Sequence, residues 1–407
     1  MSALAVDDPR NAGLPRLLQG AHHDEPLPAL SSERLLAEIE SSGLTGRGGA
    51  GFPAAAKLRT VARGRAPVVV ANGTEGEPAS AKDKVLLAAD PHLVIDGAVV
   101  AARLVGAREI HLAAGAGDPH GVAALHHALA ERRDDIAFEL AVLPDRFIAG
   151  EESALVNFLN GGPAKPTIDR PYERGVRGRP TLVQNVETLA NLALIARYGA
   201  AWFRRLGTDD EPGTALVTAL GAVRAPGVAE IELGMTLREV LQGFGGLSAI
   251  PQAFLLGGYF GTWVAARDVY DLPFTNASLG SFGASLGART VVALPQEACG
   301  LAETARVVRY LADESAQQCG PCFFGLPAIA AAFETLAAGG PDTRAACARL
   351  AQLVPQVEGR GACAHPTGAS RLVRSALRVF AHEIELHRAG SCSGAHAPSV
   401  LPIPERS

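Results

Sequence analysis

The chain has 407 residues, of which 48% are apolar and 19% charged, so two or three domains with sizeable cores are expected. Its net charge of −5 and the lack of a long basic run argue against nucleic-acid binding. No apolar stretch of about 18 residues and no signal-peptide core stand out, so the sequence predicts a cytoplasmic protein without a membrane span.

The first half of the chain alternates between predicted strands and helices. An arm over residues 1–28 comes first, followed by helices at 32–42 and 54–63. Strands are then expected at 67–71, 109–113 and 136–143, and helices at 92–105, 121–132, 151–160 and 185–198. This alternation is typical of a mainly parallel sheet covered by helices, so we predict an α/β domain over residues 29–208.

The pattern changes near residues 209–213. Short β-type runs at 215–220, 227–232 and 254–256 accompany one helix at 237–242, which predicts a small α+β domain over 209–296. From residue 301 the chain is helical again, at 301–313, 326–337, 343–354 and 369–388. That spacing suits a four-helix bundle over 297–390, with residues 391–407 as a tail.

A glycine-rich segment, Gly46–Gly51, lies between the first two predicted helices. Backbone without side chains can approach a ligand closely, and the next helix offers its N-terminal N–H groups to a phosphate. Lys57 on that helix would add a positive charge. Because the usual dinucleotide fingerprint follows a strand and this segment follows a helix, a plain glycine-rich turn is an equal alternative.

Polar side chains follow the first predicted strand and open two later helices. Asn72, Glu75 and Glu77 come directly after that strand, where open α/β sheets bind ligands. Amide and carboxylate groups suit the polar edge of a flavin and the hydroxyls of a ribose. The residues at helix starts are Glu151, Glu152, Gln184 and Asn185. Taken singly, the segment after the strand is better explained as a solvated acidic turn, and the residues at helix starts as helix caps.

All six cysteines lie in the last third of the chain. Cys319 and Cys322 form a C-x-x-C turn stiffened by Pro321, and Cys363 follows in a later loop. In a reducing compartment such a group indicates metal rather than disulfides. Converging thiolates suit an iron–sulfur cluster or zinc, and His365 keeps a site of three cysteines and one histidine open. Unligated core cysteines are the remaining alternative.

Taken together, the motifs resemble one family: the NADH-oxidising flavoprotein subunit of respiratory complex I, with relatives in NAD-linked hydrogenases and formate dehydrogenases. The resemblance runs from Leu30 to Glu385. Its motifs are G-R-G-G-A-G-F-P at 46–53, N-x-x-E-G-E-P at 72–78, A-D-P-H at 89–92, G-E-E at 150–152, N-V-E-T at 185–188 and E-S-x-x-x-C-x-P-C at 314–322. It implies a Rossmann-like FMN-binding domain, a ubiquitin-like β-grasp domain of the soluble-ligand-binding type and a C-terminal four-helix iron–sulfur domain.

The resemblance also implies roles for individual residues. Positions around FMN and its phosphate would be Gly46, Arg47, Gly48, Lys57, Asn72, Glu75, Gly150, Glu151 and Asn185, with Thr74 and Gln184 beside them. Positions used by NADH or NADPH would be Gly49, Phe52, Glu77, Glu152 and Tyr172. Cys319, Cys322 and Cys363 match three of the four ligands of a [4Fe–4S] cluster.

The implied activity needs no catalytic side chain. Hydride would pass from the nicotinamide to FMN, with Glu77 and Glu152 nearby, and the electrons would go singly to the cluster. The outlet would be a ferredoxin or an electron-accepting partner subunit. Direction, acceptor and the choice between NADH and NADPH stay open.

The chain departs from the family pattern at several positions. Ala316 replaces the first cluster cysteine, which leaves open a three-cysteine cluster, an empty site or a substitute ligand. The possible substitutes are Cys347, Cys392 and His365. Thr60, Thr74 and Asp169 also replace family residues. Two other functions therefore stay open: a non-enzymatic assembly subunit that retains the cofactor, and a zinc-stabilised protein that binds a small ligand.

Overall fold

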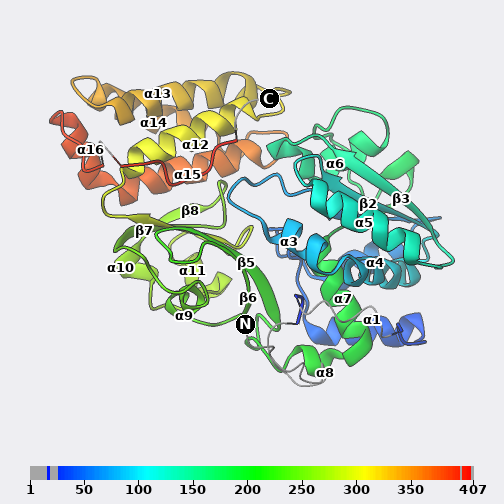
Figure 1. Ribbon diagram of the computed structural model, residues 1–407. Coiled ribbons are helices and arrows are strands. Elements are labelled where there is room, and N and C mark those ends of the chain that lie inside the picture. Colours follow the sequence, from blue (N-terminus) through cyan, green and yellow to red (C-terminus); the bar gives the residue numbers. More distant parts are fainter. Residues whose placement is uncertain (1–15, 19–25, 395–396, 405–407) are drawn as a thin grey trace.

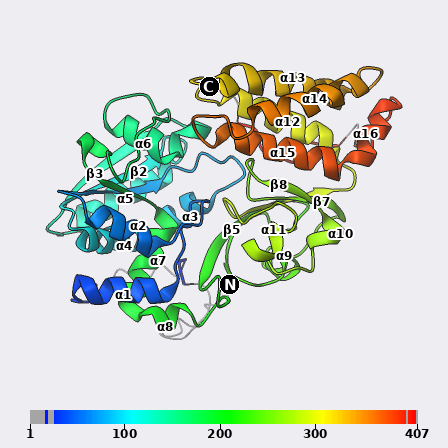
Figure 2. The same cartoon turned by 180° about the vertical axis from the view of Figure 1, so that it is seen from behind.

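The computed structural model describes residues 16–18, 26–394 and 397–404, so most of the predicted arm over 1–28 lies outside it. A stack of C-terminal helices lies over a five-stranded region, and an α/β region lies beside both (Figure 1). The view from behind shows the same arrangement (Figure 2).

The α/β region is built on a parallel sheet in the order β3-β2-β1-β4. Its strands are β1 (Val68–Gly73), β2 (Glu109–Gly115), β3 (Ala137–Leu143) and β4 (Thr181–Asn185). Its helices are α1 (Ser32–Ser42), α2 (Ala54–Ala62), α3 (Lys82–Ala89), α4 (Pro91–Val105), α5 (Pro119–Glu131), α6 (Glu152–Leu159), α7 (Val186–Tyr198) and α8 (Ala200–Phe203). β1 is buried along nearly its whole length, as strands covered on both faces are. The predicted parallel sheet covered by helices is confirmed.

The strand β4 and the helix α3 are among the elements of this region that escaped prediction. No strand is expected at 181–185, yet β4 pairs there with β1, from Val68↔Thr181 to Asn72↔Asn185. Its run is short and follows a proline, so no periodicity marks it. No helix is expected at 82–89 either, where α3 begins with charged residues that normally indicate a solvated turn.

The middle region is a five-stranded mixed sheet in the order β6-β5-β9-β7-β8. Its strands are β5 (Thr214–Gly221), β6 (Gly227–Glu232), β7 (Pro251–Leu256), β8 (Thr262–Ala265) and β9 (Thr290–Pro295). β5 and β9 run parallel at its centre, whereas the outer pairs are antiparallel. The predicted helix, α9 (Leu237–Gln242), starts with a capping box between Thr236 and Glu239. Two short helices follow, α10 (Ala266–Val269) and α11 (Asn276–Gly280).

The C-terminal region is helical. It contains α12 (Gly300–Asp313), the π-helical turn η4 (Pro321–Gly325), α13 (Leu326–Ala338), α14 (Thr343–Val357), α15 (His365–Val379) and α16 (Ala381–Arg388). The single helix predicted at 369–388 is therefore wrong. It is split at Phe380, whose backbone leaves the helical region (φ −99°, ψ 28°) while its ring is buried.

One described stretch, Pro321–Ala338, is long and apolar enough by composition to cross a membrane, and the bent pair α3–α4 would pass as a second. The expectation that no such stretch exists overlooked this window. A third of this window is buried (33%), including Leu326, Ile329 and Phe333, which pack in the C-terminal core.

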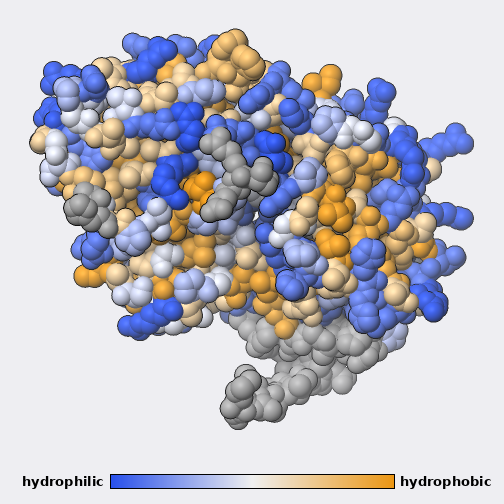
Figure 3. Space-filling view, turned by 45° about the horizontal axis from the view of Figure 1, so that its top comes forward, coloured by the Kyte–Doolittle hydropathy of each residue, from blue (hydrophilic) through white to orange (hydrophobic). Residues whose placement is uncertain are grey.

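Hydrophobic residues (orange) lie among hydrophilic ones (blue) on the face shown in Figure 3. The large apolar side chains that are exposed among the described residues are Phe52, Val142, Ile168, Ile250, Phe323 and Phe324. The rings of Phe323 and Phe324 meet edge to face, 4.9 Å apart, directly after Cys322. The predicted metal-binding turn therefore has an apolar rim.

Gly97 sets the distance between α4 and α7, which pack closely at the centre of the α/β region. A Cβ at this position would overlap the backbone carbonyl of Leu189 on α7. We expect Gly97→Ala to lower the free energy of unfolding by at least about 1–3 kcal/mol, because the two helices must move apart. Urea unfolding measures this. Gly280→Ala is the control, since nothing lies within 4 Å of its Cβ; an equally small effect of both changes would contradict the packing argument.

Candidate functional site

The carboxyl ends of β1 and β4 meet at one edge of the parallel sheet, where several predicted residues gather. Asn72 Nδ2 donates to the carbonyl of Gly150 at 2.9 Å, and Thr74 Oγ1 donates to Asn72 Oδ1 at 2.5 Å. Asn185 Nδ2 donates to the carbonyl of Asn72 at 3.4 Å, and Asn185 Oδ1 caps α7 by accepting from Glu187 N. Strand ends and the turn η2 (Phe147–Gly150) thus bring three separate motifs together.

The glycine-rich loop Gly46–Gly51 lies against the same edge. A Cβ on Gly48 would lie 3.1 Å from the Cβ of Asn185, and Gly49 and Gly51 have φ of 113° and 64°. The first turn of α2 follows, and no side chain caps it. Bare backbone and uncapped N–H groups at one place form a cradle that suits a phosphate, so these residues fit a bound FMN.

Lys57 on α2 and Glu152 on α6 form an ion pair at this edge. Both are predicted cofactor contacts, and each now has the other as its partner. The side chain of Lys57 is 17% exposed and that of Glu152 is 45% exposed. The pair is accessible, so a phosphate can share the Lys57 charge.

The guanidinium of Arg47 is occupied elsewhere. It donates to the carbonyls of Pro212 and Thr214 at 3.3 and 3.1 Å, where the α/β region meets β5. Burial, and then the charge of Arg289, lower the pKa of Arg47 to about 9. Arg289 Nη1 donates to the carbonyl of Arg47 at 3.0 Å. A charge contact from Arg47 to a phosphate is therefore not supported, and its backbone is what remains for the cofactor.

The two carboxylates after β1, Glu75 and Glu77, accept hydrogen bonds from different parts of the chain. Glu75 accepts from Ser80 Oγ and from the N–H groups of Asp83 and Lys84 at the start of α3. Glu77 accepts from Ala79 N at 3.2 Å and from Tyr259 N at 2.7 Å. Tyr259 follows β7, so Glu77 ties the cofactor edge to the middle region. Burial raises the pKa of each carboxyl to about 7.

The pH dependence of stability should report Glu77. Burial raises its pKa from 4.5 to about 7, so the folded protein keeps a proton that the unfolded chain has lost in this range. Its contribution to the free energy of unfolding should therefore fall as pH rises from about 5 to about 8. We expect the stability difference between the wild type and Glu77→Gln to change with pH over this window in cofactor-free protein. A stability difference that does not change with pH over this window would contradict the assignment.

The remaining predicted residues surround these contacts. Glu151 caps α6 by accepting from Ser153 N and Ala154 N at 3.0 and 2.9 Å. Gln184 is buried in β4 opposite Ala71. Gly46 N donates to the carbonyl of Phe52, and the ring of Phe52 is exposed. Tyr172 is half-buried, and its hydroxyl oxygen accepts a hydrogen bond from Arg170.

A buried ion network beneath the edge was not predicted. Lys82 Nζ lies 2.6 Å from Asp83 Oδ1, 2.9 Å from Glu187 Oε2 and 3.3 Å from Asn185 Oδ1. Asn185 Nδ2 in turn donates to Asp83 Oδ2 at 2.7 Å. The network therefore fixes the amide of Asn185. Its sequence signal is weak, because a Lys-Asp-Lys run at a helix start normally indicates a solvated surface.

The three predicted cluster cysteines come together at the ends of α12, η4 and α15. Backbone N–H groups of Ala362 and Cys322 donate to Cys319, that of Gln317 to Cys322 and that of His365 to Cys363. Hydrogen bonds of this kind stabilise thiolates and tune iron–sulfur clusters, so the residues fit such a group. Although burial opposes it, these donors lower the pKa of Cys319, whereas burial raises that of Cys322 to about 12.

The three residues that could replace the missing fourth ligand lie in different surroundings. Ala316 is buried in place of the family's cysteine. Cys347 lies on α14, and Cys392 lies in a different group of side chains, with Cys299 and His387. His365 Nε2 donates to the carbonyl of Leu311 at 2.7 Å, which leaves Nδ1 buried without a hydrogen-bond partner.

Glu314 joins the cysteine region to the cofactor edge. It accepts from Phe147 N at 3.0 Å and from Arg146 Nε at 2.8 Å, both at the start of η2. The ring of Phe147 packs against Phe260 on one side, with centroids 4.8 Å apart. Burial, and then the nearby carboxylate of Glu151, raise the pKa of Cys363. The two predicted redox sites are therefore neighbours.

Comparison with known proteins gives matches along nearly the whole chain. A family described as the Nuo51 FMN-binding domain matches residues 39–194, and one described as the NADH-ubiquinone oxidoreductase-F iron-sulfur binding region matches residues 302–387. An NADH-quinone oxidoreductase subunit of Rhizobium meliloti (strain 1021) is 30% identical over 370 residues, covering 86% of this chain and 87% of that protein. The corresponding subunit of Escherichia coli (strain K12) is 30% identical over 381 residues, with 88% and 85% covered.

A solved structure is also similar. It is the NAD+-reducing [NiFe]-hydrogenase in the air-oxidized state, with a TM-score of 0.80 and 32% identity over 90% of this chain. This chain spans only 65% of that hydrogenase chain.

Proposed function

Because the chain belongs to the same family as these NADH-quinone oxidoreductase subunits, we propose that it oxidises NADH with FMN and passes the electrons to an iron–sulfur centre. FMN, when bound, takes up a hydride equivalent from the nicotinamide and gives up the electrons singly. The observation that carries the proposal is the gathering of Gly48, Asn72 and Asn185 at one sheet edge. There the ring of Phe147 lies 5.6 Å from the ring of His365, two residues after Cys363.

We assign the cofactor contacts residue by residue. The backbone of Gly46–Gly48, the first turn of α2 and the charge of Lys57 hold the FMN phosphate. The polar groups around the flavin are Asn72, Thr74, Glu75, Gly150, Glu151, Gln184 and Asn185. The nicotinamide dinucleotide uses Gly49, Glu77 and Glu152, and Phe52 and Tyr172 flank its adenine by stacking.

The cluster is a [4Fe–4S] group held by Cys319, Cys322 and Cys363. The N–H groups directed at these sulfurs and the buried Nδ1 of His365 support this assignment. An imidazole nitrogen at the fourth iron would replace the thiolate missing at Ala316.

We further propose three domains: FMN- and NADH-binding at 29–208, β-grasp at 209–296 and a four-helix iron–sulfur domain at 297–390. The strand order of the middle sheet, with two parallel central strands and one packed helix, supports the β-grasp assignment. The helices α12 to α15 around one apolar core support the bundle.

The electron acceptor is a ferredoxin or a partner subunit that docks beside Cys322. Exposed Phe323 and Phe324 would supply apolar contact area next to the cluster. The six cysteines are free thiols, which suits the reducing environment of a cytoplasmic location.

The test is the visible spectrum of purified, cofactor-reconstituted protein before and after addition of NADH or NADPH. We expect flavin absorbance that NADH bleaches, weakened FMN binding in Lys57→Met and unchanged binding in the control Lys165→Met. Protein that binds no FMN would overturn the proposal. FMN that neither nucleotide bleaches would identify a non-enzymatic assembly subunit instead, a role that the loss of a ligand at Ala316 favours.

A further inference from the structure

Four potential metal ligands converge far from the cofactor edge, where the C-terminal tail crosses the helices. They are Cys299, Glu383, His387 and Cys392, and their ligand atoms all lie within 4.8 Å of one another. Cys299 caps the start of α12, Glu383 and His387 are one turn apart on α16, and Cys392 follows that helix. The cluster cysteines lie beyond the other end of α12, a helix about 20 Å long.

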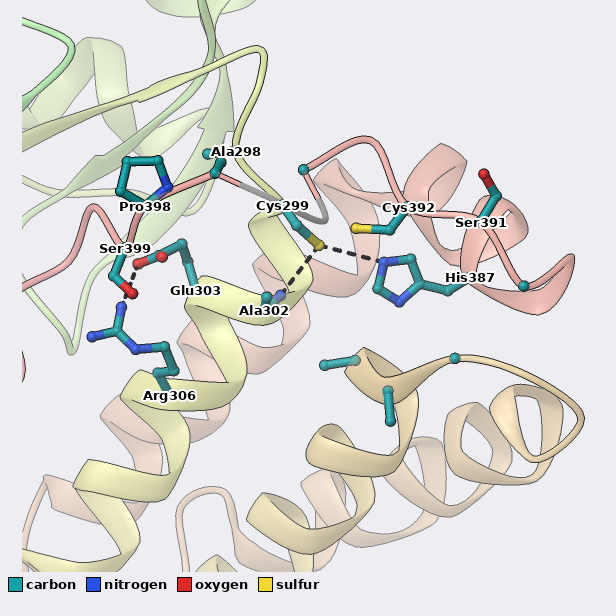
Figure 4. Close-up of a pocket in the computed structure, with 16 residues that line it drawn as sticks. Ala298, Cys299, Ala302, Glu303, Arg306, His387, Ser391, Cys392, Pro398 and Ser399 are labelled. Atoms are coloured by element: carbon teal, nitrogen blue, oxygen red, sulfur yellow. Dashed lines mark hydrogen bonds and ion pairs between the residues drawn. The ribbon is translucent and has the colours of Figure 1, made fainter.

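The side chains point at a common centre. Cys299 Sγ lies 3.4 Å from His387 Nε2, which lies 3.2 Å from Glu383 Oε1. Figure 4 shows the sulfurs of Cys299 and Cys392 and the ring of His387 directed toward one another. Cys299 and His387 are each 3% exposed and Glu383 is 7% exposed, so solvent water screens their charges only weakly.

A second set of contacts orients the ligands. The carbonyl of Leu336 lies 3.3 Å from His387 Nδ1, which favours the proton there and leaves the Nε2 lone pair toward the sulfurs. Ser393 donates to both oxygens of Glu383, at 2.9 and 2.6 Å. Ala302 N donates to Cys299 Sγ at 3.4 Å. Outer contacts of this kind are what metal ligands need to hold their geometry.

We propose that Cys299, Glu383, His387 and Cys392 bind one Zn²⁺ ion as a structural site. Two thiolates, one imidazole and one carboxylate are the donor types that zinc takes, and four protein ligands close its tetrahedral shell. A cavity of about 450 Å³ lined by Cys299, His387 and Cys392 gives the ion a route to the site.

The ion would fasten the tail to the C-terminal helices. A Cβ on Gly394 would overlap the backbone of Cys299, so the tail passes directly over the start of α12. Further on, Val400 N and Leu401 N donate to Glu303 at 3.1 and 2.9 Å, and Tyr259 Oη donates to the carbonyl of Pro402. Zinc at Cys392 would anchor the beginning of this strap, and its removal should free the tail.

The experiment measures zinc and iron per chain in the purified holoprotein after dialysis against a weak chelator. We expect one zinc in the wild type, none in Cys392→Ser and none in Cys299→Ser, with the iron content unchanged. Cys347→Ser is the matched control and should keep both metals, while Cys322→Ser should lose iron and keep zinc. Failure of the redox proposal is thereby distinguished from failure of the zinc proposal.

Cobalt spectroscopy and limited proteolysis test the same site independently of metal content. Co²⁺ loaded in place of zinc should give the intense visible bands of a tetrahedral thiolate site, and these should be absent in Cys392→Ser. Circular dichroism checks that each variant is folded. Proteinase K, which needs no Lys or Arg, should cut the tail faster in chelated wild type and in Cys392→Ser, because residues 389–405 contain neither of these residues. Wild type that carries no zinc, a disulfide between Cys299 and Cys392, or full zinc content in both Cys299→Ser and Cys392→Ser would each overturn the proposal.

Discussion

Replacement of Lys82 by methionine should lower the free energy of unfolding by about 3–5 kcal/mol, because it leaves two buried carboxylates without their cation. Lys82 Nζ lies 2.6 Å from Asp83 and 2.9 Å from Glu187, and all three side chains are at most 7% exposed. The loss should shrink at acid pH, where Asp83 and Glu187 can take up protons. Urea unfolding at several pH values measures both effects.

The same replacement should weaken FMN binding, because Lys82 and Asp83 together orient the amide of Asn185. Fluorescence titration of cofactor-free protein with FMN measures this. Arg59→Met is the control: it removes the exposed pair with Glu40, which should change stability by no more than about 1 kcal/mol. A loss in Lys82→Met as small as in Arg59→Met would mean that the buried network contributes little.

Cys322→Ser should remove nearly all of the cluster iron while FMN stays bound. Cys322 is buried and supplies one of only three thiolates, because Ala316 stands where the family has a further cysteine. NADH should still bleach the flavin, because the contacts at the sheet edge are unaffected. Iron analysis and the electron paramagnetic resonance of the reduced protein report the cluster. Flavin content reports bound FMN, and the visible spectrum reports bleaching by NADH.

Cys347→Ser provides the comparison for this experiment, since Cys347 lies on α14 and the proposed cluster takes His365 rather than Cys347 as its fourth ligand. It should keep iron and flavin. Equal iron content in Cys322→Ser and the wild type would mean that Cys322 is not a ligand of an iron–sulfur cluster.

The sequence predicts those elements whose signal is local. Helix α1 is read from its Ser31 cap and Gly43 stop, and β1 from a run of valines that the fold buries on both faces. β4 and β9 are missed, since each is a short apolar run whose partners lie elsewhere in the chain. The family resemblance, drawn from motifs in order, is confirmed by the relatives.

The candidate site divides in the same way. Side chains at strand ends and helix starts, such as Asn72 and Asn185, could be placed because parallel strands bring their carboxyl ends to one edge. The partners Tyr259, Arg289 and Glu314 could not be placed from the sequence. Each belongs to the middle or C-terminal region, far along the chain from the residue that it contacts. The direction of the Arg47 side chain depends on such contacts too, which explains why a phosphate contact was expected of it.

The bonds from Tyr259 to Glu77 and from Arg289 to the carbonyl of Arg47 also set an order of events during synthesis. A ribosome releases residues 46–51 and 72–77 long before 259 and 289, and Cys363 later still. Although the parallel sheet can form early, its ligand-binding edge stays unbraced until most of the chain has emerged. Cofactor loading should therefore be a late step of maturation, and a nascent chain stalled before residue 259 should hold FMN poorly.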